Sequence, residues 1–539
     1  MTSTIPCSIG NWAAAFLPIL VLLVLMIKFR WRAAEAAPMG LFAALIIALT
    51  VFRANLTLIA AEASKGIWSA LVVLIVIWPA LLMYEISNEA NAFDAFRSGI
   101  RRLLPNELIQ IMAIGLGFVG FLIGITGFGV PVAVGAPLLI GIGVSPLYAV
   151  VISLIGEAWG STFGTLGVAW DAMRLAAGLD ADPQMLLKTA FWAGVFIWIW
   201  NLIVALTVCW LYDGWRGVKK GLPAALLVSL IQGGGQLLVG QFNQTLACFL
   251  PTCAALIVLF LLGRTRLYGT PWRAEDSPIM LRERESASAE SGAEGMSLIE
   301  AFVPYIVLTA ITLAVLLIKP VKDFLGQWSF GFALPETSTG YGFTNPAVDC
   351  YSPLSPLTHA SFFLIISSII GYIYYVKKRR LKSGSFKPAV LRSVYKVIPS
   401  GIAVIGFLIM SRIMSGSGMT SVLADGMARV MGSAYALLAP MVGLLGAFMT
   451  SSNMASNILF SEFQLTTAKL LGLDAAGILG AQTAGGAIGT ATCPGNITLG
   501  CTTAGIAGRE GEALRKTLPL SIASAVFVGV ILFIILTVL

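Results

Sequence analysis

Charged side chains are scarce in this sequence. Only 11% of its 539 residues are Asp, Glu, Lys or Arg, whereas about a quarter are charged in an ordinary soluble protein. Apolar residues make up 58% of the chain, and runs of ~20 of them, long enough for a helix to cross a bilayer, recur throughout. The ~10-residue alternating segments of a membrane β-barrel are absent. The composition therefore predicts an all-α polytopic membrane protein.

Residues with catalytic or metal-binding chemistry are equally few. His359 is the single histidine, and one imidazole alone forms neither a zinc site nor a catalytic triad. The sequence contains no HExxH, no GxSxG and no phosphate-binding loop ending in Lys-Ser/Thr. The seven cysteines form no CxxC pair. These absences predict a protein that is not an enzyme and has neither cofactor nor metal site. No loop is long enough for the soluble output domain of a sensor.

One apolar stretch, residues 124–167, is repeatedly broken by Gly, Pro, Ser and Thr, and it carries one carboxylate, Glu157. An unsatisfied backbone amide costs several kcal/mol in hydrocarbon, so irregular chain at membrane depth persists only inside protein or beside a watery cavity. In secondary transporters such broken helices form the substrate site. The stretch is therefore a predicted binding site.

The same order of features returns at residues 446–492. A first break begins at Thr126 (TGFG) and at Thr450 (TSSN), and an apolar run follows each. A second break is aligned at Glu157 and at Gln482, which lie 31 and 32 positions after those threonines. Paired, interrupted segments predict two halves related by an inverted repeat. The alternative is close packing of glycine-rich helices.

Basic residues organise the chain into two halves. Residues 263–297, rich in Arg, Ser and Glu, are predicted to be a cytoplasmic linker between a transmembrane half at 1–262 and another at 298–539. The weakly charged segment 319–359 is predicted to be external. We expect roughly 12 to 14 transmembrane helices, because the short broken pieces can be re-entrant or can cross fully.

Hydroxyl and amide side chains gather at both breaks. Together with the positive ends of half-helices they can bind an anion, or they can coordinate a cation. Capping of the broken helices is the structural alternative. The candidate substrate-binding residues at the two breaks are Thr126, Gly127, Gly129, Ser451, Ser452, Asn453, Ser456 and Asn457. A matching polar set after the second half-helix contains Gln482, Thr483, Thr490, Thr492 and Asn496. Of these, Gln482, Thr483 and Thr490 are also candidate substrate-binding residues.

Two charged residues within apolar surroundings complete the candidate site. A carboxylate such as Glu157 is costly in a membrane and usually marks an ion or proton path. Because burial favours its protonated form, we expect Glu157 to couple proton movement to transport; an ion pair or a helix cap is the structural alternative. Arg412 ends an apolar run and is a candidate for holding a substrate carboxylate in a bidentate contact. Snorkelling to the interface is the alternative there.

Four segments resemble the L-lactate permease family, including its glycolate-transporting members. They are TGFGVPVAV (126–134), SGSGMTSVLA (415–424), SSNMASNILFSEFQ (451–464) and QTAGGAIGTATCPGNI (482–497). The resemblance implies a multi-pass protein of the bacterial inner membrane. It also implies import of a small 2-hydroxymonocarboxylate, such as lactate or glycolate, by proton symport.

The sequence departs from the family pattern at three places. The family usually carries a Lys where this chain has Thr490, Asn-Thr where it has Gln482-Thr483, and a Gln where it has Pro494-Gly495. If that Lys neutralises the substrate carboxylate in the family, this protein either uses Arg412 for that role or transports another substrate. Two other functions stay open. One is a sodium-coupled carboxylate carrier, because hydroxyls and unwound carbonyls also suit Na⁺. The other is an uncoupled anion channel.

Overall fold

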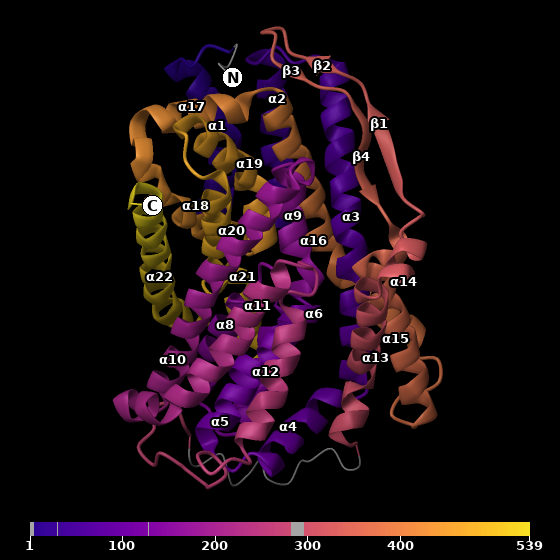
Figure 1. The fold of residues 1–539 in the computed structure, drawn as a ribbon, viewed down its shortest axis with the longest axis vertical. Helices are drawn as coiled ribbons and strands as arrows, with labels where there is room; N and C mark the ends of the chain where they lie inside the picture. The colour runs from indigo at the N-terminus through magenta and orange to yellow at the C-terminus, as the bar shows by residue number, and fades with distance from the viewer. Residues whose placement is uncertain (1–4, 30, 128, 282–295, 539) are drawn as a thin grey trace.

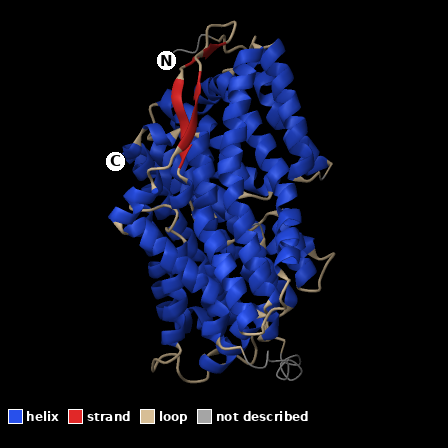
Figure 2. Ribbon diagram, turned by 90° about the vertical axis from the view of Figure 1, so that its right-hand side faces the viewer, coloured by secondary structure: helices blue, strands red, loops and turns tan. Residues whose placement is uncertain are grey.

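The computed structural model describes residues 5–29, 31–127, 129–281 and 296–538. Phe128 of the first break and the predicted linker residues 282–295 lie outside these ranges. Within them, ten helices are long and apolar enough to cross a membrane, and three shorter apolar helices accompany them. Helices make up almost the whole molecule (Figure 2). The predicted all-α polytopic fold is therefore confirmed.

One group of helices is built on two long helices, α3 and α16, which pack against each other. Its members are α1 (Ile9–Leu23) with η1 (Val24–Lys28), α2 (Ala33–Thr50), α3 (Leu56–Glu89), α4 (Ala92–Leu103), α13 (Leu298–Leu317), α14 (Lys319–Leu325), α15 (Ala360–Lys377) and α16 (Phe386–Gly416). Glycine lets these helices approach closely: a Cβ on Gly66 would lie 2.7 Å from the Cα of Ile409. Such small-residue contacts are how membrane helices associate without a hydrophobic driving force.

The first repeat is a helical hairpin followed by an interrupted helix. The continuous helix formed by α5 (Glu107–Met112), η2 (Ala113–Phe118) and α6 (Val119–Ile125) ends at the first break, and α7 (Val130–Gly141) returns from it. The interrupted helix consists of α8 (Pro146–Ala158) and α9 (Gly164–Ala176).

The second repeat has the same order of elements. Here α18 (Tyr435–Thr450) and α19 (Asn453–Leu471) form the hairpin, and α20 (Ala475–Thr490) and α21 (Pro494–Thr503) form the interrupted helix. In Figure 1 the first hairpin rises from the end of the molecule that holds α4 and α5, whereas the second descends from the opposite end, near the N-terminus. The two repeats are thus inverted, as the paired breaks predict.

The remaining helices cover the two repeats. They are α10 (Pro183–Ser229) with η4 (Leu230–Gly234) and α11 (Gly235–Gly240), α12 (Phe249–Leu262), α17 (Met419–Met431) and α22 (Glu510–Val538), with short 3-10 turns at Leu179–Ala181, Pro356–Thr358 and Gly432–Ala434. The element from Pro183 to Gly240 reverses at Asp213 and Gly214, whose backbone angles are not helical. Its two legs are antiparallel, since Asn201 donates to Gln232 Oε1 at 3.1 Å. One of the ten long apolar helices therefore consists of two antiparallel legs.

Segment 319–359 contains the strands of the structure. Antiparallel strands β1 (Phe330–Leu334) and β4 (Val348–Leu354) pair with each other, as do β2 (Thr337–Ser338) and β3 (Thr344–Asn345). The ribbon lies along α3, where Trp68 Nε1 donates to the Ser352 oxygen at 2.9 Å.

Within the predicted linker, residues 263–281 pack across the base of the first hairpin. The Glu107 amide donates to the Trp272 oxygen (3.2 Å), and the Leu281 amide donates to the Gly143 oxygen (2.8 Å). The Ser145 amide donates to Ile279 O at 2.7 Å. This segment, called the strap below, joins both legs of the hairpin through backbone bonds.

Candidate functional site

Four interruptions meet in the middle of the fold. Two are hairpin tips, one between α6 and α7 and the other at residues 451–452 between α18 and α19. The other two lie within the interrupted helices, at 159–167 and 491–493. The local residues suit these breaks. Gly129 has a φ of 80°, a left-handed conformation that glycine adopts without strain. Ser451 also has a positive φ, 56°, and is followed by the extended Ser452 that caps α19.

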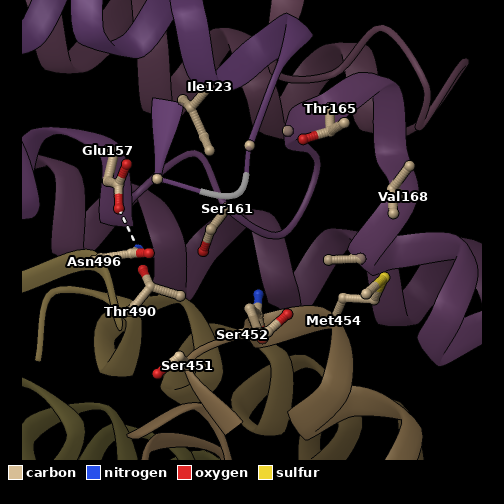
Figure 3. Close-up of a pocket in the computed structure, with 15 residues that line it drawn as sticks. Ile123, Glu157, Ser161, Thr165, Val168, Ser451, Ser452, Met454, Thr490 and Asn496 are labelled. Atoms are coloured by element: carbon tan, nitrogen blue, oxygen red, sulfur yellow. Dashed lines mark hydrogen bonds between the residues drawn. The ribbon is translucent and has the colours of Figure 1, made fainter. Parts of the chain in front are cut away.

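A cavity of about 60 Å³ lies where the interruptions meet. Figure 3 shows side chains of the first and the second half facing each other across it. From the first half it is lined by Ile123, Gly127, Gly129, Glu157, Ser161, Gly164, Thr165, Val168 and Ala169. From the second half it is lined by Ser451, Ser452, Asn453, Met454, Thr490 and Asn496.

The helix ends give this cavity a distinctive electrostatic character. Helices α7, α9, α19 and α21 begin beside it, while α6, α8, α18 and α20 end there. Unpaired N–H groups and the positive ends of helix dipoles favour anions, and unpaired carbonyls at the negative ends favour cations. Among the described lining residues there is no Lys, Arg or His. An anion in this cavity would therefore be held by hydroxyls, amides and helix N-termini.

Glu157 is the acidic residue of the cavity. It is 2% exposed, and its Oε1 accepts a hydrogen bond from Asn496 Nδ2 at 2.6 Å (Figure 3). The backbone amide of Val132, in the first turn of α7, faces the same carboxyl. Its Oε2 makes no hydrogen bond to the residues that the structure describes. The carboxyl therefore bridges the two halves and retains an oxygen that can carry a proton.

Hydrogen bonds between the halves hold the second tip in place. Asn453 Nδ2 donates to Thr162 Oγ1 (3.1 Å), and Thr162 Oγ1 lies 3.1 Å from Thr483 Oγ1. Asn457 Nδ2 donates to Thr483 Oγ1 at 2.9 Å and to the Ala169 oxygen at 3.0 Å. Asn457 and Thr483 thus support the cavity from behind and do not line it.

Gln482 and Ser456 belong to a second buried network, inside the second half. Gln464 Nε2 donates to Gln482 Oε1 at 2.8 Å, and Gln482 Nε2 donates to Ser456 Oγ at 3.2 Å. Ser456 Oγ in turn donates to the Gly443 oxygen at 2.8 Å. These bonds join α18, α19 and α20, and neither residue lines the cavity.

Arg412 also lies apart from the cavity. Its guanidinium donates to the Leu175 oxygen at the end of α9 and lies 4.0 Å from Glu462 Oε2 on α19. The ring of Tyr351 lies 5.7 Å from it. The geometry therefore supports a role in holding helices and gives no support to direct substrate contact.

The structure thus brings only part of the predicted set to the cavity. The predicted residues that line it are Gly127, Gly129, Glu157, Ser451, Ser452, Asn453 and Thr490. Thr126 is buried directly beside them, and its hydroxyl makes no hydrogen bond to the described residues. Sequence reasoning missed Ser161 and Thr165. Both lie at the interruption between α8 and α9, and the small-residue run GSTFGTLG could have indicated them. Asn496 stood in the predicted polar set but not among the binding residues.

A family profile described as L-lactate permease matches residues 12–539. The glycolate permease GlcA of Escherichia coli strain K12 is 26% identical, covering 96% of this chain and 94% of the relative. The L-lactate permease of the same strain is 27% identical, with the same coverage. The crystal structure of the Alcanivorax borkumensis YdaH transporter aligns with 13% identity and a TM-score of 0.41, covering 86% of this chain and 84% of the other.

Proposed function

Because this chain belongs to the L-lactate permease family, we propose that it imports a small 2-hydroxymonocarboxylate, such as lactate or glycolate, by proton symport across the bacterial inner membrane. The cavity at the meeting of the four interruptions is the observation that carries this proposal. Alternating access of the cavity to the two sides of the membrane would move the anion.

The chemistry of the cavity suits such a substrate. A carboxylate can accept hydrogen bonds from backbone N–H groups in the first turn of α19, where the helix dipole is positive. The hydroxyls of Ser161, Ser452 and Thr490 can pair with the substrate 2-hydroxyl. The small volume, about 60 Å³, favours a molecule with few heavy atoms.

Glu157 supplies a physical reason for proton coupling. A substrate carboxylate and an ionised Glu157 would repel each other strongly within one small cavity of low dielectric constant. A proton on Glu157 removes this repulsion and lets the carboxyl keep its contact with Asn496. Substrate and proton would then bind together and leave together, which is symport.

Sodium coupling is the second candidate, favoured by one observation. Four helices, α6, α8, α18 and α20, end beside the cavity, and their unpaired carbonyls are suitable ligands for Na⁺. In that case a cation in place of a proton would neutralise the anion.

Uptake into proteoliposomes tests the function. Labelled lactate, glycolate and a panel of related anions would each be supplied with an imposed proton gradient and, separately, with a sodium gradient. We expect lactate or glycolate to accumulate with the proton gradient alone. Accumulation with sodium alone would favour the second candidate. Gradient-independent flux without saturation would indicate a channel, and accumulation of another anion would refute the substrate assignment.

A further inference from the structure

The middle of α19 is held by one polar face of α16. Ser411 Oγ donates to the backbone oxygen of Ile458 at 2.9 Å. One turn further along both helices, Ser415 donates to the Glu462 carboxylate, and Arg412 Nη1 lies 4.0 Å from Glu462 Oε2. Residues four apart share a helix face, so these contacts form one continuous strip between the two helices.

Arg412 also reaches the end of α9. Its Nη2 donates to the Leu175 oxygen, in the last helical turn, where carbonyls have no partner within the helix. A guanidinium there complements the negative end of the helix dipole as well. Arg412 therefore connects α16 to two helices whose N-terminal ends carry the cavity residues Thr165 and Asn453.

The charges around this strip are mostly buried and are balanced. The side chain of Arg412 is 13% exposed and that of Glu462 is 25% exposed. Beside them on α3, Glu62 and Lys65 form an ion pair of 2.6 Å, with side chains 3% and 12% exposed. Two acids face two bases, so the loss of one charge leaves another buried without its partner, which is strongly unfavourable.

We propose that Arg412 and Glu462 are positioning residues, which hold α9 and the second hairpin at a fixed separation and thereby set the width of the cavity. Glu462 lies nine positions after Asn453 on the same helix, roughly 13 Å along its axis. A displacement of α19 at Glu462 is therefore transmitted to the tip at Asn453. This inference rests on the proposed function only in taking the cavity as the substrate site.

The contact between Arg412 and Glu462 leaves some of their polar atoms without a hydrogen bond, unlike a fully bonded structural ion pair. Arg412 Nε and Glu462 Oε2 are buried and make no hydrogen bond to the described residues. Buried polar atoms without partners are costly. Separating Arg412 and Glu462 therefore costs less free energy than separating a fully hydrogen-bonded pair. Such a contact suits two helices that must part during a transport cycle.

Hydrogen exchange of the protein in lipid nanodiscs, without substrate, tests the proposal. Glu462→Gln removes the charge and keeps an acceptor for Ser415. We expect exchange of residues 447–457 to become about tenfold faster, the size expected when the charge-assisted hydrogen bond from Ser415 becomes a neutral one. Exchange of residues 119–127 in the first hairpin should not change. Arg392→Gln is the matched control, because it removes an arginine from the far end of α16, where it pairs with Glu85 at 2.8 Å; neither tip should respond.

A double variant separates positioning from misfolding. In Arg412→Gln/Glu462→Gln neither charge is left alone, so thermal stability should recover while exchange at the second tip stays fast. An equal rise at both tips, or wild-type exchange at the second tip in both variants, would overturn the proposal. The readout needs no substrate. Failure of the wild-type protein to transport lactate or glycolate would refute the proposed function, and it would leave this result standing.

Discussion

The two hairpins share one layout, yet they are fastened by different kinds of bond. The base of the first hairpin is tied to the strap by backbone hydrogen bonds at Glu107, Gly143 and Ser145. The second hairpin is held chiefly by side chains: Glu462 contacts α16, and Asp474 pairs with Lys188 at 3.1 Å. Side-chain contacts separate more readily than a backbone ladder. From this difference we expect the second hairpin to be the one that moves.

The hairpin tips differ as well. The first tip presents Gly127 and Gly129, and therefore backbone, to the cavity, while the second presents Ser451, Ser452 and Asn453. The carboxylate of the cavity, Glu157, belongs to the first half. The first half thus supplies the titratable group, and the second supplies most of the side-chain hydrogen bonds at the tips.

The largest effect should follow from removing that carboxylate. Glu157→Gln keeps the size of the side chain but cannot bind and release a proton. We expect complete loss of accumulation driven by a pH gradient, with exchange of labelled for unlabelled anion retained. Proteoliposome uptake and counterflow measure both. Glu89→Gln, at the end of α3, is the control and should transport normally; unchanged driven uptake in Glu157→Gln would remove this residue from the mechanism.

A smaller effect is expected at the second tip. Asn453→Ala removes the hydrogen bond to Thr162 between the halves, which is 3.1 Å long, and one lining amide. An unsatisfied buried group costs about 1–3 kcal/mol, so the half-saturating concentration should rise roughly tenfold to a hundredfold. Concentration-dependent uptake measures this change. Asn88→Ala, at an exposed position on α3, should leave the concentration unchanged, and wild-type affinity of Asn453→Ala would show that the second tip does not bind substrate.

The strap should matter for stability and much less for affinity. The indole of Trp272 packs edge-on against Tyr212 at 5.3 Å, and Lys220 lies 4.2 Å from the ring. Trp272→Ala should lower the melting temperature by about 1 °C for each kcal/mol lost, with half-saturation of uptake unchanged. A thermal unfolding curve and an uptake curve on one preparation give both values. A large change in affinity at normal stability would mean that the first hairpin also moves.

The smallest effect is expected at the turn between α19 and α20. Asp474→Asn removes an ion pair whose lysine side chain is 58% exposed, and exposed pairs contribute at most about 1 kcal/mol. We expect a slight loss of thermal stability, which high salt should abolish, and normal uptake. A strong transport defect would show instead that this turn takes part in closing the site.

The sequence predicts the plan of the fold well, because its strongest signals are physical ones. Long apolar runs require membrane helices, and the breaks at Thr126 and Thr450 can survive at membrane depth only within protein. Their pairing gives the inverted repeat, and the glycines at 127 and 129 lie at the cavity as expected. The strap was not foreseen, since backbone bonds at Gly143 and Ser145 leave no mark on side-chain composition.

The spacing of the sequence did not predict which residues of the second repeat lie at its second break. Equal spacing aligned Glu157 with Gln482, but Glu157 lies next to the end of α8, whereas Gln482 lies inside α20. The reason is that α19 has 19 residues and α7 has 12, so the register shifts by about two turns. Thr490, at the end of α20, therefore lines the cavity while Gln482 and Thr483 lie behind it. The charge of Arg412 makes it a candidate for binding the substrate carboxylate. Only the tertiary structure shows that its guanidinium contacts Glu462 and the Leu175 oxygen instead.

The central claim is that the substrate anion binds where the four interruptions meet. Electron cryomicroscopy of the protein in lipid nanodiscs, with saturating lactate or glycolate, tests it most directly. We predict density for the anion between Gly127–Gly129 of the first tip and Ser451–Asn453 of the second, within reach of Glu157 and Asn496. An empty cavity with the anion bound elsewhere, for example beside Arg412, in a preparation that transports, would contradict the account.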